Sequence, residues 1–146
     1  MRLSTRSRYG VRFMVDLALR GGENAVYLKD IAREEGLSEK YLSLIAIPLK
    51  SAGLIVAQRG AKGGYRLARP ASRITLKEIV EVLEKGVCIV ECVGDPSTCS
   101  RSGHCPSRDL WAEITDRIAS TLASVTLEDL ARKGREKAYA ACMYVI

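Results

Sequence analysis

The chain is poor in several features on which enzymes and membrane proteins depend. It has one histidine, His104, among 146 residues and no glycine-rich phosphate loop between a strand and a helix. No nucleophile–base pair or nucleotide motif therefore indicates an enzyme or a small-molecule substrate. No apolar run reaches the roughly 18 residues of a membrane span, and the basic N-terminus lacks the apolar stretch of a secretory signal. These absences predict a cytoplasmic protein that is not an enzyme and does not enter a membrane.

The composition is that of a soluble, folded protein, with 47% hydrophobic and 27% charged residues and a net charge of +6. The charge is unevenly distributed. Residues 1–70 carry 13 Lys and Arg against 6 Asp and Glu, which gives +7, whereas residues 71–146 carry 10 against 11, which gives −1. A basic first half indicates a surface that faces a polyanion, although a merely basic soluble protein would show the same balance.

Four of the five cysteines fall within the segment 87–106, VCIVECVGDPSTCSRSGHCP. They are Cys88, Cys92, Cys99 and Cys105, and the last three have the spacing C-x6-C-x5-C. Glycines, prolines and an Asp-Pro pair predict turns here, and few apolar side chains are available to fold the segment. In a reducing compartment such clustered thiols favour a metal ion or cluster over disulfides. Cys142 is interpreted as an ordinary residue.

The first half contains signals for a DNA-binding unit. Residues 4–20 have the apolar periodicity of a helix capped by Ser4 or Thr5. Residues 28–51 predict two short helices, with Gly36 in the left-handed turn between them and Ser38 capping the second. This arrangement is typical of a helix-turn-helix, and Pro48 is expected to kink or shorten the second helix.

Two short strand-like runs follow, within residues 54–68, and a basic, glycine-rich turn joins them. A hairpin of this kind is a wing, and Arg59, Lys62 and Arg66 lie on or beside it, where they suit phosphates or a narrow minor groove. A helix-turn-helix followed directly by a basic wing predicts binding to nucleic acid.

The second half is predicted to be helical around the cysteine segment. Thr75 and Glu78 have capping-box spacing at the start of a helix that ends near Lys85. Pro106 begins a long helix, and Thr126 begins a short final one. The long helix has an apolar stripe of Leu110, Trp111, Ile114, Ile118, Leu122 and Val125. We interpret this stripe as a subunit interface; the alternative is that it folds back on its own domain.

The expected fold is therefore mainly α with a small β-wing. It comprises a winged helix-turn-helix domain (residues 1–80, with the helix-turn-helix at about 28–51 and the wing at about 54–68), a linker helix and cysteine-rich loop (81–105), and a dimerisation helix with a C-terminal tail (106–146).

Four stretches, MRLSTRSRYGVRFMVDLAL, IAREEGLSEKYL, RGAKGGYRLAR and CPSRDLW, resemble the Rrf-two family of bacterial winged-helix regulators. The resemblance implies a homodimer that binds a double-stranded, pseudo-palindromic operator. It also implies an iron–sulfur cluster that senses redox state, nitric oxide or iron–sulfur status, and Cys92, Cys99 and Cys105 match the family's three ligands. The candidate DNA-binding residues are Ser38, Glu39, Lys40, Tyr41, Ser43, Arg59, Lys62 and Arg66.

The chain departs from the family's patterns at the fourth ligand. One branch has a histidine three residues after the third cysteine, where this chain has Arg108; another uses an acidic residue of the first helix, and the corresponding place in this chain is Arg8 or a near neighbour. The candidates that remain are His104, Cys88 and Glu91, or a residue of the partner subunit, and the cluster type, 2Fe–2S or 4Fe–4S, stays open.

Two other interpretations are kept. The same winged-helix regulator could sense through bare thiols or through zinc, which accepts three cysteines and a histidine. Alternatively, the chain could be a small iron–sulfur electron-transfer protein whose first half is only a scaffold.

Overall fold

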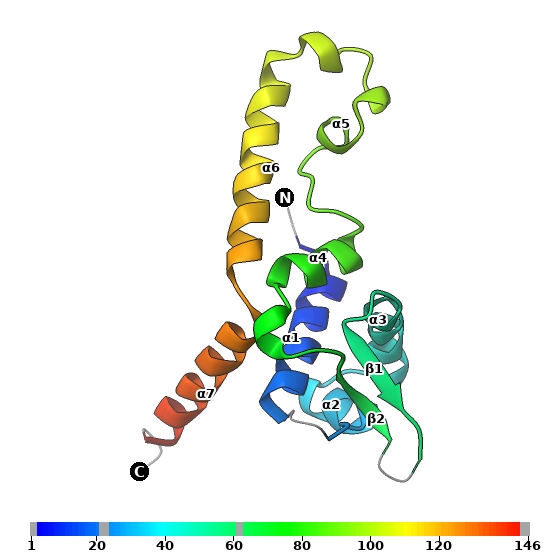
Figure 1. Cartoon of the computed structure of the whole chain (residues 1–146), viewed down its shortest axis with the longest axis vertical. Helices are drawn as coiled ribbons and strands as arrows, with labels where there is room; N and C mark the ends of the chain where they lie inside the picture. The colour runs from blue at the N-terminus through cyan, green and yellow to red at the C-terminus, as the bar shows by residue number, and fades with distance from the viewer. Residues whose placement is uncertain (1–2, 21–23, 61–62, 144–146) are drawn as a thin grey trace.

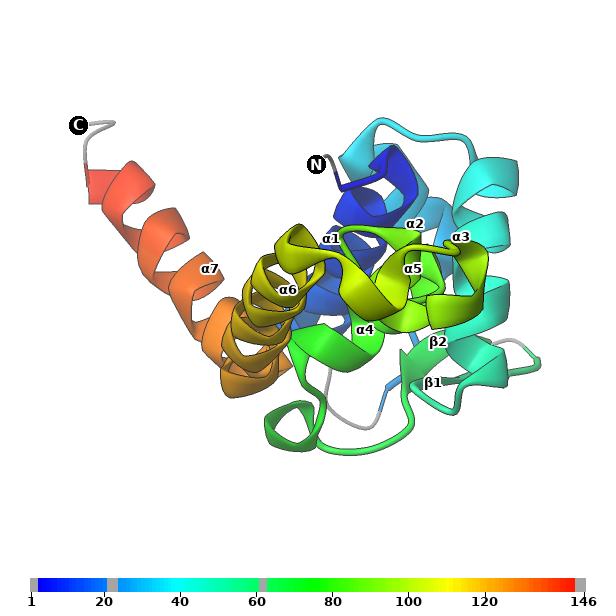
Figure 2. The ribbon, with the colours of Figure 1, turned by 90° about the horizontal axis from the view of Figure 1, so that it is seen from above.

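The computed structural model describes residues 3–20, 24–60 and 63–143, and it confirms a mainly helical fold with one small hairpin (Figure 1). Helices α1 to α4 and the hairpin form a head, from which α6 rises and α7 projects; the view from above shows α7 extending away from the head (Figure 2). The elements are α1 (Thr5–Arg20), α2 (Leu28–Glu35), α3 (Glu39–Ser51), β1 (Ile55–Gln58), β2 (Gly64–Leu67), η1 (Ala71–Arg73), α4 (Leu76–Glu84), α5 (Glu91–Gly94), η2 (Pro96–Thr98), η3 (Ser102–His104), α6 (Pro106–Ser124) and α7 (Leu127–Met143).

The core of the head is formed where α1, α3 and α4 pack together and α2 and β1 close its sides. Its fully buried side chains include Phe13, Leu17, Ile31, Leu42, Ile45, Leu49, Leu54, Ile55, Ile74, Ile79 and Leu127. Leu127 comes from the far end of the chain. The segment before α7 is fixed to the head by backbone hydrogen bonds from Leu127 N to Ile74 O, 2.8 Å, and from Leu76 N to Val125 O, 2.9 Å.

The helix-turn-helix forms as its local signals predict. Gly36 has φ 65, a conformation that costs a residue with a Cβ more than it costs glycine, and Leu37 N donates to Ala32 O at 2.8 Å. Ser38 Oγ then accepts from Tyr41 N at 3.1 Å and caps α3.

Pro48 does not end α3, which continues to Ser51. Its missing N–H removes the partner of the Leu44 carbonyl, one turn earlier. Because Leu44 is 54% exposed, water can replace the lost donor there, and the expected shortening of the helix is not observed.

The predicted capping box of α4 is confirmed, since Glu78 N donates to Thr75 Oγ1 and Thr75 N to Glu78 Oε2. The expectation of a short final helix is wrong, because α7 has 17 residues. The same reciprocal cap starts it, from Thr126 N to Asp129 Oδ2 and from Asp129 N to Thr126 Oγ1. Beyond it, Ala, Arg, Lys and Glu are strong helix formers, which extend a helix of which only Leu127 and Ala131 are buried.

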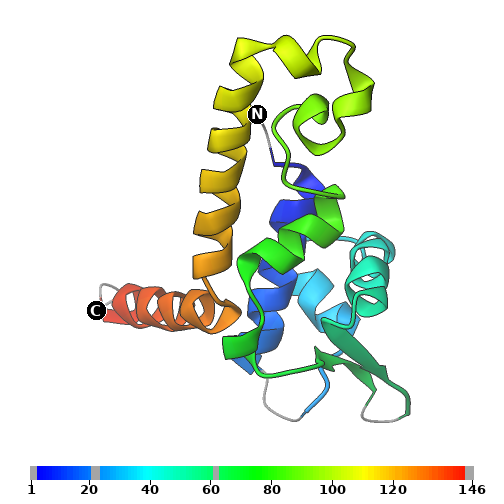
Figure 3. The same cartoon turned by 45° about the horizontal axis from the view of Figure 1, so that its top comes forward.

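The wing is a two-stranded antiparallel hairpin in which Ile55 pairs with Leu67 and Gln58 with Gly64. Its base is held by the segment before α2, because Val26 and Tyr65 exchange two backbone hydrogen bonds of 2.8 Å. Gly64 makes this contact possible: its φ is +132, and a Cβ there would lie 2.2 Å from the Val26 oxygen. Figure 3 shows the hairpin at the opposite end of the molecule from the turns that precede α6, with α3 between them.

Among the described residues, no helix combines the length and the apolar character needed to cross a membrane.

We expect Gly64→Ala to lower the free energy of unfolding by about 3 kcal/mol, because it adds positive-φ strain and a clash with the Val26 backbone. Gly60→Ala is the matched control: φ is +105, but nothing lies within 4 Å, so we expect a loss of about 1 kcal/mol. Urea unfolding of both variants measures the difference. Equal losses would mean that the contact with Val26 does not constrain the wing.

Candidate nucleic-acid interface and cysteine loop

The outward face of α3 is fixed by the core on its other side. Leu42, Ile45, Ala46 and Leu49 are fully buried, so the middle of the exposed face is formed by Lys40, Leu44, Ile47 and Ser51, at helical spacing. Of the predicted DNA-binding residues, Ser38, Glu39 and Lys40 are exposed at the start of the helix, and Ser43 is half-buried at the edge of this face.

Sequence reasoning missed Leu44 and Ile47, which are 54% and 55% exposed. Apolar residues on a short amphipathic helix are usually assigned to the core. Only the burial of Leu42, Ile45, Ala46 and Leu49 in the structure shows that Leu44 and Ile47 lie on the opposite side of a helix with 3.6 residues per turn.

Tyr41 attaches α3 to α1. Its half-buried ring meets the Tyr9 ring edge to face, with centroids 6.2 Å apart and planes at 89°, and the Arg12 guanidinium lies 5.5 Å from the centroid of Tyr9. Arg12 also forms an ion pair with Glu35 of α2. The predicted DNA residue Tyr41 is thus part of the contact that positions the N-terminal end of α3.

The wing presents free positive charge. Arg59 and Arg66 are exposed, and within the described part of the chain neither they nor Lys40 take part in an ion pair. The predicted wing residue Lys62 lies outside the described residues. Unpaired cations on α3 and on the hairpin suit the phosphates on either side of a groove.

The cysteine loop has no buried residue in α5, η2 or η3. Hydrogen bonds of short polar side chains hold it instead. Asp95 Oδ1 accepts from Ser97 N at 2.9 Å, Thr98 Oγ1 donates to Asp95 O at 2.8 Å, and Ser102 Oγ donates to Pro96 O at 2.8 Å. The cysteine loop therefore consists of single helical turns, as its glycines and prolines predict.

Two contacts join this loop to α6. Arg108 Nε donates to Cys92 O at 2.9 Å, and Ile89 N donates to Thr115 Oγ1 at 3.4 Å. Arg108, which replaces the histidine of one family branch, thus ties α5 to the first turn of α6.

The three predicted ligands lie on three successive turns: Cys92 in α5, Cys99 after η2 and Cys105 at the N-cap of α6. All are free and half-buried. Of the fourth-ligand candidates, Glu91, His104 and Cys88 are all exposed, and the Cys88 sulfur is 3.0 Å from where a Cβ on Gly94 would lie.

The donors that the loop offers are thiols, which as thiolates bind both zinc and the irons of an iron–sulfur cluster. In residues 3–20, 24–60 and 63–143, no three His, Cys, Asp or Glu side chains form a group that could hold one ion. Three free thiols on one loop are the type of donor that an iron–sulfur cluster requires.

Cys105 has a local environment that favours its thiolate. The Ser107 hydroxyl, 3.2 Å from the sulfur, and the Arg108 N–H lower the pKa of the Cys105 thiol below its ordinary value. These hydrogen bonds are the main cause of the lowered pKa.

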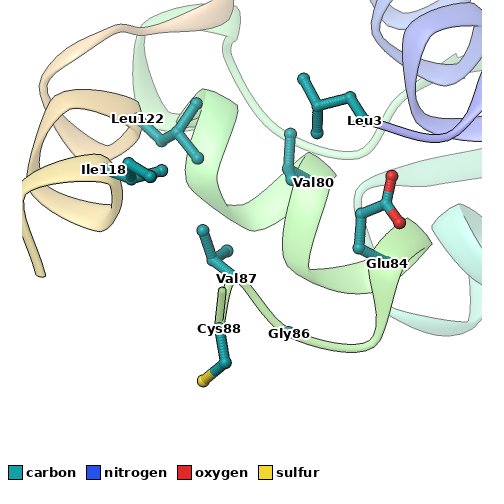
Figure 4. A pocket seen from close by; sticks show the side chains of 8 residues that line it. All are labelled: Leu3, Val80, Glu84, Gly86, Val87, Cys88, Ile118 and Leu122. Carbon is teal, nitrogen blue, oxygen red and sulfur yellow. The ribbon is translucent and has the colours of Figure 1, made fainter. Parts of the chain in front are cut away.

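An apolar cavity of about 210 Å³ lies where the chain leaves α4 for the cysteine loop. Figure 4 shows Leu3, Val80, Val87, Ile118 and Leu122 around it, while the sulfur of Cys88 points away from these side chains. Two of the six residues of the predicted stripe of α6, Ile118 and Leu122, therefore line a cavity, and two others, Leu110 and Trp111, are 52% and 37% exposed.

The fold and these two surfaces define a winged helix-turn-helix DNA-binding protein with an appended cysteine loop. The comparisons give the family: residues 3–133 match Rrf2, described as "Iron-dependent Transcriptional regulator". The chain belongs to the Rrf2 family of DNA-binding transcriptional regulators, which are not enzymes.

Three relatives illustrate the range of this family. The chain is 41% identical over 132 residues to Protein rrf2 of Nitratidesulfovibrio vulgaris, covering 90% of this chain and 88% of that one. It is 40% identical to the regulator CymR of Bacillus subtilis, covering 95% and 97%. The solved CymR structure, titled as that of the global cysteine regulator, covers 91% of this chain and 98% of its own with a TM-score of 0.76. The structure of T. potens IscR is 36% identical and covers 94% and 90%, also with a TM-score of 0.76.

We expect Lys40→Ala and Arg59→Ala each to weaken binding to duplex DNA and to reduce the slope of log affinity against log salt by about one per protomer, because each removes one phosphate contact. Lys133→Ala, an exposed lysine of α7, is the control and should change neither quantity. Fluorescence anisotropy at several salt concentrations measures both. Wild-type slopes for both test variants would place the DNA face elsewhere.

Proposed function

We propose that the protein is a homodimeric regulator whose affinity for a pseudo-palindromic operator is set by an iron–sulfur cluster on Cys92, Cys99 and Cys105. The observation that carries the proposal is a loop with three free thiols and no core, inserted between α4 of the DNA-binding head and α6. The family description as iron-dependent and the similarity to IscR support it. A regulator of this kind acts in the cytoplasm, where its operator is.

The roles proposed for the parts follow the division at residues 80 and 105. The head (1–80) binds DNA, the linker and loop (81–105) sense, and the remainder (106–146) joins two copies. When bound, the cluster supplies a centre that reacts to redox state or nitric oxide. The chain's part is to hold it: Arg108 fixes the backbone at Cys92, and Ser107 stabilises the Cys105 thiolate. The fourth ligand comes from Cys88, His104, Glu91 or the partner subunit.

A path from loop to DNA exists in the packing. The loop is tied to α6 through Arg108 and Thr115, and α6 contacts α4, which packs against α1 and α3. A change in the loop that rotates α6 would alter the spacing of the two α3 helices in a dimer. Regulation then depends on the difference in operator affinity between the two states.

A second candidate function is regulation by the thiols themselves, without iron. The similarity to CymR favours it, and free cysteines with a stabilised Cys105 thiolate are open to oxidation. Zinc belongs to this alternative as well, because it also accepts three cysteines and a histidine. The interpretation as an electron carrier has no support in the comparisons.

The dimer is proposed from the apolar surface of α6. Leu110 and Trp111 are exposed on the half of the helix nearest the loop, and Ile118 and Leu122 line the cavity on the other half. A two-fold axis brings the same surface of both copies together, so an antiparallel pair of α6 helices would place exposed residues of one copy beside the cavity of the other. Exposed aromatic residues are frequent anchors of such interfaces.

For the cluster, we expect protein purified without oxygen to be coloured and to contain iron and sulfide, and Cys99→Ala to lose its visible absorption while remaining dimeric. Cys142→Ala is the matched control, an exposed cysteine of α7 outside the loop, and should keep the colour. Cluster-loaded and cluster-free protein should differ in operator affinity by about fivefold or more. Equal affinities would reject sensing through the cluster; colourless, iron-free protein whose affinity responds to thiol oxidation would favour the second candidate.

For the dimer, we expect Trp111→Ala to weaken self-association at least tenfold, by loss of a buried aromatic anchor. Sedimentation equilibrium measures the constant, and Tyr139→Ala, at 71% exposure on α7, is the control. Trp111 is the only tryptophan, so its emission should shift to longer wavelength on dilution. A dimerisation constant equal to that of the wild type in the Trp111 variant would show that the interface does not include this half of α6.

A further inference from the structure

Two large apolar side chains stand at the centre of the face that α3 presents to solvent. Leu44 is 54% and Ile47 55% exposed, and they are one turn apart on the same side of the helix. Burial of the opposite side fixes this orientation, since Leu42, Ile45, Ala46 and Leu49 are 0% exposed. The two side chains are therefore held outward by the core and are not needed for it.

The surroundings of this pair indicate a polyanion rather than a protein partner. Lys40 precedes Leu44 by one turn, Lys50 follows Ile47 in the next, and the wing contributes Arg59 and Arg66. All four side chains are exposed cations. An apolar pair with an exposed lysine one turn before it and another one turn after it, on the second helix of a helix-turn-helix, suits the DNA major groove.

The major groove has one apolar feature, the C5-methyl group of thymine, and cytosine, adenine and guanine have no equivalent there. We propose that Leu44 and Ile47 are specificity-determining residues that contact thymine methyl groups at two neighbouring positions of the operator. The pair adds direct apolar readout to the polar and phosphate contacts assigned to Ser38, Lys40 and Ser43.

The spacing of Leu44 and Ile47 along the helix axis agrees with the spacing of two neighbouring base pairs. Residues three apart are separated by about 4.5 Å along a helix axis, and successive bases of one strand by about 3.4 Å. Leu44 lies in the second turn, closer to the N-terminal end that enters the groove, so its contact should contribute more than that of Ile47.

The experiment starts with full-length protein and random duplexes, from which bound sequences are enriched. Each enriched thymine is then replaced singly by deoxyuridine, which removes the methyl group and keeps every hydrogen-bonding atom. We expect replacement at one or two positions per half-site to weaken binding about fourfold each, the value of one buried methyl group.

Variants assign the effect to a side chain. Leu44→Ala should bind the thymine duplex more weakly and lose the distinction between thymine and deoxyuridine at one position. Lys40→Ala is the control, which should weaken both duplexes equally because it removes a phosphate contact. Since Leu44 is exposed and outside the core, the alanine variant should unfold at the same urea concentration as the wild type.

Four results would overturn the proposal. Equal binding of thymine and deoxyuridine duplexes by the wild type would exclude methyl readout while leaving DNA binding intact. A full thymine preference in Leu44→Ala would assign the readout to another residue. If no sequence were enriched, the protein would not bind DNA in a sequence-specific way. If Leu44→Ala changed the sedimentation of the protein without DNA, the pair would belong to a protein–protein interface.

Discussion

The burial of one face of α3 against α1 and α4 is the constraint on which the candidate DNA-binding surface depends. Leu42, Ile45 and Leu49 enter the same core as Phe13 and Ile79. Because the side chains of a helix have fixed directions around its axis, burying these side chains decides which others point outward. The edge-to-face contact of Tyr41 with Tyr9 then sets the position of the helix N-terminus. The position of the candidate DNA-binding surface therefore follows from the packing of the core.

The cysteine loop is stabilised by a different kind of interaction. It has no buried side chains in its three turns, and short polar residues such as Asp95 and Ser102 satisfy its backbone. Each such hydrogen bond contributes on the order of 1 kcal/mol net, so the segment belongs to the less stable part of the fold. A segment of low local stability next to α6 is suited to exist in two arrangements, which a ligand or an oxidant could then select.

The far end of the chain is used in two ways. The first two turns of α7 pack on the head and bury Leu127 and Ala131, whereas residues 135–143 project with their side chains exposed. The preceding helix, α6, carries apolar residues that are only partly covered within one copy of the chain. The same stretch thus completes the core and presents the surface assigned to the second subunit.

The caps and turns could be predicted from the chain alone. Gly36, Ser38, the Thr75–Glu78 box and the wing turn depend on contacts between residues a few positions apart, so their spacing is sufficient. The candidate DNA and cysteine residues likewise follow from motifs. Other features required the folded chain: the place of Leu127 in the core, the link from Arg108 to the Cys92 carbonyl, and the outward position of Leu44 and Ile47. Each results from packing or bonding between segments far apart in the sequence or from the rotation that such packing imposes on a helix, and no local pattern of residues contains that information.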